Sequence, residues 1–239
     1  MNTTKTQLDL GCGTAKKPGF IGLDLFELPG VDHVLDLTSE RFPFDDDSVD
    51  SVFSAHFLEH IDEPNHVFEE IGRVCRDGAR IEIWTPYAWT NEAFLYGHVH
   101  FISEEMWHHV CLSHRDAYTP MLKGRWLLRR VVFVIQPATI ADLQRRSIDL
   151  DFAVKYLKGV VHEFGVEMEY RSDLSAPAVM PERVYATERF GARKPFAVRP
   201  PGMKHELKSL ASSMTSQLRS MSGRARHSLI RRLHGNPRT

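Results

Sequence analysis

The sequence has few cysteines and no long apolar run. Its 239 residues include three cysteines, and no Cys-x-x-Cys pair occurs among them. Three cysteines cannot build a disulfide framework, and the missing pairs exclude a cysteine-based zinc motif. No stretch of about 18 apolar residues is present, so we do not expect a transmembrane helix. The N-terminus also lacks a signal-peptide core, and we therefore expect a reduced, cytoplasmic protein.

Charge is nearly balanced over the whole chain but is unevenly placed. The net charge is −1. Residues 201–239 carry eight lysines and arginines and one acid (net +7), whereas residues 1–200 carry 22 basic and 30 acidic side chains (net −8). An acidic body disfavours nucleic-acid binding, because basic groups are needed to neutralise phosphates.

Prolines at 195, 200 and 201 predict a linker between the two parts. We expect a main domain over residues 1–200 and a basic tail or helix over 201–239. Three interpretations of the tail stay open. It is a solvated end, a segment that docks on an acidic partner or a second copy of the chain, or an interfacial helix on an anionic membrane.

Short apolar segments alternate with turns and one amphipathic helix. The helix is expected over Asn65–Arg76, with Gly78 as its C-terminal cap. Strands and helices in alternation predict an α/β fold with a parallel sheet. The expected strands in this first part are Gln7–Leu10, Phe20–Leu25, His33–Leu37, Val49–Ser54 and Ala79–Thr85.

The region from about 87 to 150 departs from this alternation. It is rich in histidines and aromatic residues, and we expect it to be a cap inserted over one face of the sheet. Two later segments, Val166–Tyr170 and Val184–Phe190, predict a hairpin-like finish that makes the sheet mixed.

A glycine-rich turn directly follows the first expected strand. The segment Leu8-Asp-Leu-Gly-Cys-Gly lets another molecule approach the backbone closely, and Asp24 ends the next strand. An acid at this position can accept hydrogen bonds from ribose hydroxyls. Gly13 and Asp24 are only 11 positions apart, whereas a dinucleotide-binding unit places its acid about 20 residues on, and no complete GxGxxG occurs. A nicotinamide-dependent dehydrogenase is therefore disfavoured.

Four segments in order carry a resemblance to a known family. They are Leu8–Gly13, Phe42–Asp50, His56–Ile61 and Glu70–Gly78. Together they resemble the class I S-adenosylmethionine-dependent methyltransferases, in the small-molecule branch with Leu-Glu-His after strand four. The resemblance covers about residues 7–86 and implies a Rossmann-like sheet, mostly parallel with an antiparallel finish. The abbreviated loop Thr14–Gly19 is similar to that of enzymes associated with sugars and polysaccharides.

The resemblance implies that residues at the ends of the first four strands hold S-adenosylmethionine. Asp24 would bind the ribose hydroxyls, with Glu27 as the nearest substitute if Asp24 packs elsewhere. Asp36 and Leu37 would flank the adenine, although Asp36 is also interpretable as a turn acid. The implied cofactor-binding residues are Asp9, Gly11, Gly13, Asp24, Asp36, Leu37, Ser54, Ala55 and His56.

The acceptor is less clearly marked. Methyltransferases of exocyclic base amines often carry Asn/Asp-Pro-Pro-Tyr after strand four, where this chain has Ser54-Ala-His-Phe57. We therefore expect O-methylation of a small-molecule hydroxyl, on a sugar or saccharide. The alternatives are an RNA or protein methyltransferase tethered by the basic tail, and a non-catalytic scaffold with a methyltransferase-like fold.

A hydroxyl must lose its proton when it is methylated, so a base or a metal ion is useful. Histidine suits the first role because its ordinary pKa lies near neutrality. His56 and His60 stand near the methyl group by motif position, and His100 lies in the expected cap. We take these three as the catalytic candidates. Glu59 is expected to cap the helix after strand four.

A catalytic metal stays open as an alternative. Magnesium prefers carboxylates and water, and Asp45, Asp46 and Asp47 form a carboxylate run that solvated turn acids also explain. The spacing His98-x-His100 suits zinc, but no His-Glu-x-x-His motif is present. The sequence names no definite metal ligand.

Overall fold

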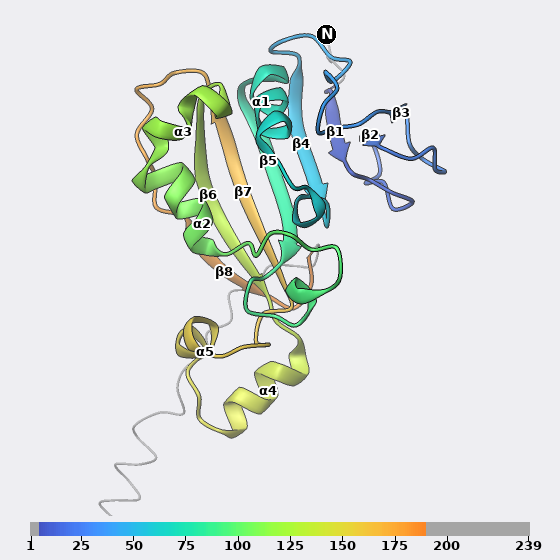
Figure 1. The fold of residues 1–239 in the computed structure, drawn as a ribbon. Coiled ribbons are helices and arrows are strands. Elements are labelled where there is room, and N and C mark those ends of the chain that lie inside the picture. The colour runs from blue at the N-terminus through green and yellow to red at the C-terminus, as the bar shows by residue number, and fades with distance from the viewer. Residues whose placement is uncertain (1–4, 190–239) are drawn as a thin grey trace, which may run out of the picture.

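The alternating segments form one eight-stranded sheet in a computed structural model that describes residues 5–189 (Figure 1). The expected basic tail lies outside the described residues. None of the helices within 5–189 is long and apolar enough to cross a membrane. The strands are β1 (Gln7–Leu10), β2 (Ile21–Asp24), β3 (His33–Val34), β4 (Val49–Ala55), β5 (Cys75–Pro86), β6 (Arg125–Val134), β7 (Glu163–Arg171) and β8 (Glu182–Ala186). The helical elements are η1 (Leu58–His60), α1 (Asn65–Val74), η2 (Glu92–Phe94), α2 (Glu104–His108), the π-helical turn η3 (His109–Ser113), α3 (Arg115–Leu122), α4 (Pro137–Arg145) and α5 (Leu150–Tyr156).

The strand order is β3-β2-β1-β4-β5-β7-β6-β8. β1 to β5 pair in parallel, β7 runs antiparallel to both β5 and β6, and β8 pairs in parallel with β6. This confirms the expected Rossmann-like sheet, mostly parallel with an antiparallel part. The hairpin-like finish is wrong, because β7 lies between β5 and β6 and β8 lies on the other side of β6.

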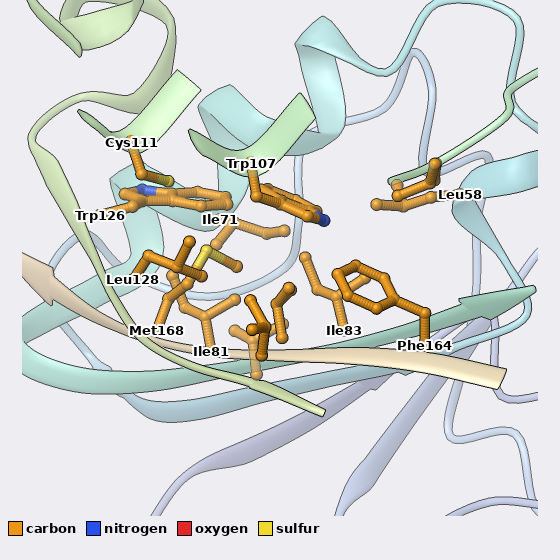
Figure 2. Close-up of a cluster of buried hydrophobic side chains, with 14 of the residues drawn as sticks. Leu58, Ile71, Ile81, Ile83, Trp107, Cys111, Trp126, Leu128, Phe164 and Met168 are labelled. Carbon is orange, nitrogen blue, oxygen red and sulfur yellow. The ribbon is translucent and has the colours of Figure 1, made fainter. Parts of the chain in front are cut away.

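The main core lies between the sheet and α1, α2 and α3, which cover one face (Figure 1). Figure 2 shows Trp107 and Trp126 above Ile81, Ile83 and Met168 of the sheet. Helices α1 and α3 approach closely, since a Cβ atom added to Gly72 would lie 2.1 Å from the carbonyl oxygen of Leu122.

A smaller apolar cluster lies on the opposite face of the sheet. It contains Phe53 and Trp84 with the alternate residues of β6 and β8. A Cβ atom added to Gly165 would lie 2.5 Å from the Trp84 ring, so the indole packs directly on the β7 backbone. Alternation along the strands separates the two clusters, because successive side chains point to opposite faces.

The junction between α1 and β5 differs from the expectation. The helix ends at Val74, and Cys75 is already extended and pairs with Val49 of β4. Val74 and Cys75 are both fully buried, so the chain enters the core where the predicted helix continues to Arg76. Gly78, with φ +82°, lies within β5 at a register shift against β4, and its expected capping role is wrong.

The expected insertion over 87–150 is also shorter than predicted. Its residues from Arg125 to Val134 form β6, a strand inside the sheet. The sequence of β6 is mostly apolar because both faces of the strand are buried. Leu128 and Val131 pack in the main core on one face, and Val132 packs in the smaller cluster on the other. Residues before β6 form the loop after β5 and the helices α2 and α3.

Candidate active site

The glycine turn after β1 lies at the carboxyl ends of the parallel strands. Gly11 and Gly13 both have left-handed backbone conformations, with φ of +65° and +50°. A Cβ atom at Gly11 would lie 2.4 Å from the ring of Phe57, so this position needs glycine. A Cβ atom at Gly13 would meet no heavy atom within 4 Å, so Gly13 faces open space. The turn therefore leaves room for a ligand beside the backbone.

Two buried carboxylates hold this turn in place. Asp24 accepts hydrogen bonds from the backbone N–H groups of Gly13 (2.8 Å) and Phe26 (3.0 Å). Asp9 accepts one from the N–H group of Lys17 (2.7 Å), and burial raises the pKa of its carboxyl group. Each carboxylate keeps lone pairs for further donors, since an ionised carboxylate offers about four acceptor positions.

Two pockets meet at this turn. One, of about 420 Å³, is lined by Gly13, Asp24, Asp36 and Leu37 of the expected cofactor residues. The other, of about 360 Å³, is lined by Asp9 and Ala55. Gly11 and His56 line both pockets. The structure thus gathers all the predicted cofactor residues around the two pockets except Ser54.

Ser54 is buried away from both pockets. Its hydroxyl donates a hydrogen bond to the carbonyl oxygen of Leu10 (3.1 Å) and links β4 to β1. Alternation along β4 explains this, because Phe53 and Ala55 point to the other face of the sheet. The structure therefore does not place the Ser54 side chain where the resemblance implies a contact with the cofactor.

Asp36 lines the first pocket but is also a turn acid. Its carboxylate accepts hydrogen bonds from the N–H and hydroxyl groups of Thr38 (2.9 and 2.6 Å) and from the Ser39 hydroxyl (2.9 Å). These bonds, led by the one from the Thr38 hydroxyl, lower the pKa of the Asp36 carboxyl group. Asp36 is thus a turn acid in the structure, which is the alternative role that the sequence left open.

His56 lies between two carboxylates. Its Nδ1 is 3.1 Å from Glu59 Oε1, and its Nε2 is 2.7 Å from Glu163 Oε1. Glu163 also pairs with Arg189. The Glu163 hydrogen bond, and then that of Glu59, raises the pKa of His56 to about 9. His56 is therefore a cation at neutral pH and has no lone pair with which to accept a proton.

The other two catalytic candidates differ in position. His60 lines the larger pocket, and its Nδ1 donates to the carbonyl oxygen of Gly97 (3.1 Å), which leaves a lone pair on Nε2. His100 lines neither pocket, and its Nε2 lies 3.3 Å from the carbonyl oxygen of Asp62. Among the three histidines, His60 combines contact with the larger pocket and a lone pair on its ring.

Glu59 is not a helix cap. It lies within η1, is 1% exposed, and gives one oxygen to His56, while its Oε2 has no hydrogen-bond partner among the described residues. Glu163 and Arg189 were not expected at the site. They lie more than 100 positions beyond His56, and no local spacing in the sequence links them to it.

The carboxylate run Asp45–Asp47, one of the two metal alternatives from the sequence, does not lie at the pockets. Asp46 pairs with Arg73 (2.7 Å) in the loop before β4. Within residues 5–189, the group with suitable ligand atoms is Glu59, His60 and His98.

The three cysteines are free and buried. Burial raises the pKa of the Cys12 thiol to about 11 and those of Cys75 and Cys111 to about 12. These thiols are protonated at neutral pH, and a thiol nucleophile needs a depressed pKa. A cysteine nucleophile is thus unsupported.

Comparison with known proteins gives a family match. Residues 21–83 match the model of a methyltransferase domain. No curated protein matches the chain significantly.

Several solved structures are similar. A SAM-dependent methyltransferase from Archaeoglobus fulgidus is 15% identical, with 70% of this chain and 87% of that chain covered and a TM-score of 0.48. Geranyl diphosphate C-methyltransferase from Streptomyces coelicolor is 17% identical (70% and 69% covered, TM-score 0.39). Phosphoethanolamine N-methyltransferase 2 from Haemonchus contortus is 15% identical (72% and 50% covered, TM-score 0.40). These likenesses are too distant to indicate an acceptor.

The family match, the sheet order and the glycine turn agree with the resemblance found in the sequence. The matched segment runs from β2 to β5 and so includes the carboxyl ends of β2 and β4, where the pockets lie. The chain therefore has a Rossmann-like sheet, and its residues 21–83 match a methyltransferase domain.

Proposed function

We propose that S-adenosylmethionine binds across both pockets and that a hydroxyl of a small molecule, a sugar or saccharide, is methylated at their junction. The smaller pocket is lined by Lys16, Lys17, His56 and Arg189, which suits the carboxylate of the methionine end. The larger pocket combines Asp24 with apolar side chains, which suits a ribose and an adenine. The bound cofactor supplies an electrophilic methyl group on its sulfonium and leaves as S-adenosylhomocysteine.

The proposed reaction type depends on the different protonation of His56 and His60. His56 is a cation fixed by Glu59 and Glu163, so it orients the turn after β4 and attracts an anionic group. His60 has a lone pair on Nε2 at the pocket wall. His60 takes the acceptor proton as the new C–O bond forms and the sulfonium C–S bond breaks. General bases of this kind contribute about 10²–10⁴-fold to a rate.

The loop after β5 supports a saccharide acceptor. It is joined to η1 through the N–H group of Val99, which donates to the carbonyl oxygen of Glu59 (2.8 Å). Phe94, Tyr96 and Phe101 of this loop are more than half exposed. Aromatic faces pack well against the apolar faces of sugar rings.

Calorimetry with S-adenosylmethionine and S-adenosylhomocysteine tests the cofactor site. Asp24→Asn removes the charge that accepts ribose hydroxyls and holds Gly13, and we expect about 10–100-fold weaker binding, or about 1.4–2.8 kcal/mol. Glu27→Gln is the matched control, because Glu27 is exposed and lines neither pocket. Equal affinity of Asp24→Asn and the unchanged protein would remove Asp24 from the site.

Turnover on a panel of mono- and oligosaccharides, with and without magnesium, tests the acceptor. We expect His60→Ala to lower kcat about 100-fold with little change in cofactor affinity, and His100→Ala to have a small effect. Methyl transfer to amines but not hydroxyls would contradict O-methylation. Cofactor binding without turnover on any acceptor would favour the scaffold alternative. Cytoplasmic location and homo-oligomer formation are further proposals that depend on the sequence alone.

A further inference from the structure

Three side chains that can ligate a metal ion converge beside the larger pocket. Glu59, His60 and His98 each offer one ligand atom, and these atoms all lie within 4.8 Å of one another. We infer that these three residues bind a divalent first-row transition-metal ion, of which Zn²⁺ is the reference case.

The backbone builds this cluster from two distant segments. The N–H groups of Val99 and His100 both donate to the carbonyl oxygen of Glu59, at 2.8 and 3.4 Å. This places the loop after β5 against η1, and the rings of His60 and His98 meet edge to face, with their centroids 4.6 Å apart. Main-chain hydrogen bonds therefore bring together the two segments that carry the imidazoles.

Two atoms of the cluster lack partners. Glu59 Oε2 and His98 Nδ1 are buried and have no hydrogen bond within the described residues. Glu59 is 1% exposed, so its carboxylate is removed from water while one of its oxygens is unsatisfied. Such a group is costly, and buried unsatisfied atoms in folded proteins call for an explanation such as an ion. A cation coordinated by both atoms satisfies both at once.

The hydrogen bonds around the cluster suit metal ligation. His60 donates its Nδ1 proton to the carbonyl oxygen of Gly97 (3.1 Å), so its Nε2 carries the lone pair. Glu59 is oriented through its other oxygen, 3.1 Å from His56 Nδ1. Ligating histidines usually donate their second ring N–H to a backbone carbonyl or a carboxylate in this way, and ligating carboxylates are themselves hydrogen-bonded.

The donor set selects the class of ion. Two imidazoles and one carboxylate favour zinc and its neighbours over magnesium, which prefers oxygen ligands and water. Zinc-to-ligand distances of about 2.0–2.2 Å place neighbouring ligand atoms about 3.3 Å apart in a tetrahedral site. The ligand atoms of the cluster lie within 4.8 Å of one another, so binding an ion requires them to move closer through the His60 and His98 side chains, which are not fully buried. Three protein ligands leave a coordination position for water or an acceptor oxygen.

The role of the ion in catalysis rests on the proposed function, whereas its binding does not. With an ion bound, His60 would be a ligand, and the ion would lower the pKa of an acceptor hydroxyl at the open position, which would lose its proton to solvent. Direct proton transfer to His60 describes the protein without the ion. Turnover of chelator-treated protein before and after Zn²⁺ addition distinguishes the two.

The binding test uses the full, untagged chain after chelator treatment, titrated with Zn²⁺ in a calorimeter and with Co²⁺ by visible absorption. We expect one equivalent to bind and the Co²⁺ bands to show nitrogen and oxygen ligation. Glu59→Gln and His98→Ala should each weaken binding at least about tenfold. His100→Ala is the matched control, since it removes an imidazole from the same loop but outside the cluster.

Thermal denaturation distinguishes loss of zinc binding from misfolding of a variant. Zn²⁺ should raise the Tm of the unchanged protein and of His100→Ala, and should raise it less in the two cluster variants, because an ion stabilises only the fold that binds it. Equal Zn²⁺ affinity in all four proteins, or an equal loss in His100→Ala, would overturn the inference. Neither measurement uses a cofactor or an acceptor, so both are independent of the proposed methyl transfer.

Discussion

The polar side chains on the two sides of the turn after β4 differ in how many of their atoms have a partner. On one side, His56, Glu163 and Arg189 form a closed set of ion pairs, and both nitrogens of His56 are used. On the other side, Glu59 Oε2 and His98 Nδ1 have no hydrogen bond within the described residues. Glu59 belongs to both sides, with one oxygen on each.

This difference distinguishes groups that can only position other residues from groups that can take part in the reaction. A group whose lone pairs and protons are all engaged holds a shape and an electrostatic field, but it accepts no proton from a substrate. A group with an unengaged lone pair is available to a proton or an ion. By this criterion we propose that the His56 side fixes the cofactor end of the site and that the His60 side binds the acceptor.

The largest effect is expected when the glycine turn that lines both pockets is disturbed. Gly11→Ala adds a Cβ atom 2.4 Å from Phe57 at a left-handed backbone position, and we expect a loss of about 3 kcal/mol in the free energy of unfolding. Gly13→Ala is the control, with backbone strain alone and a loss of about 1 kcal/mol. Urea denaturation measures both. Equal losses would show that contact with Phe57 is unimportant.

A smaller effect is expected when the closed side loses its anion. Glu163→Gln leaves His56 and Arg189 close together without the buried carboxylate between them. We expect the free energy of unfolding to fall by about 2 kcal/mol, as for hydrogen bonds to charged groups. Glu169→Gln on the same strand breaks surface pairs with Arg129 and Arg171 and should cost less than about 1 kcal/mol. If urea denaturation gives the same loss for both, the His56 side is not a stabilising network.

The third prediction, with the smallest expected effect, concerns the charge state of His56. Its pKa in the folded protein is about 9, above the ordinary value of 6.5. A raised pKa means that the ion pairs of protonated His56 stabilise the folded protein. This contribution to the free energy of unfolding is complete below pH 6.5 and is lost as the pH rises through 9. Because the side chain is 44% exposed, solvent screening limits it to about 1 kcal/mol.

The measurement compares urea denaturation at pH 6.5 and pH 9.5. The unchanged protein should lose about 1 kcal/mol more than His56→Gln over this interval. Parallel pH profiles for the two proteins would mean that His56 is not held as a cation and that it, like His60, is available as a base.

Local patterns in the sequence predicted much of the fold. Strands β1, β2 and β4 and helix α1 lie close to their expected bounds, because their apolar spacing is decided by the core they face. The errors came where tertiary pairing overrides local signals. Cys75 joins β5 through its pairing with Val49, and β6 was taken for part of an insertion because its pairing partner β7 is distant in sequence.

The residues of the candidate site also fall into those that local sequence predicts and those that depend on tertiary structure. The glycine turn and Asp24 were predictable, because a turn directly after a strand and an acid at the end of the next strand are local features. The strand direction that turns Ser54 inward depends on the sheet, and the partners of His56 come from β7 and the residues after β8. Proton availability at His56 could not be predicted, since it depends on carboxylates distant in the chain.

The place of β7 in the sheet has a consequence for synthesis on the ribosome. β5 and β6 do not pair with each other, and β7 joins them only after residues 163–171 have been made. A nascent chain that ends before β7 exposes the unpaired edges of both strands, with Ile83 and Val132 beside them. Open apolar edges recruit other strands, so the emerging chain depends on late closure of its sheet to avoid aggregation.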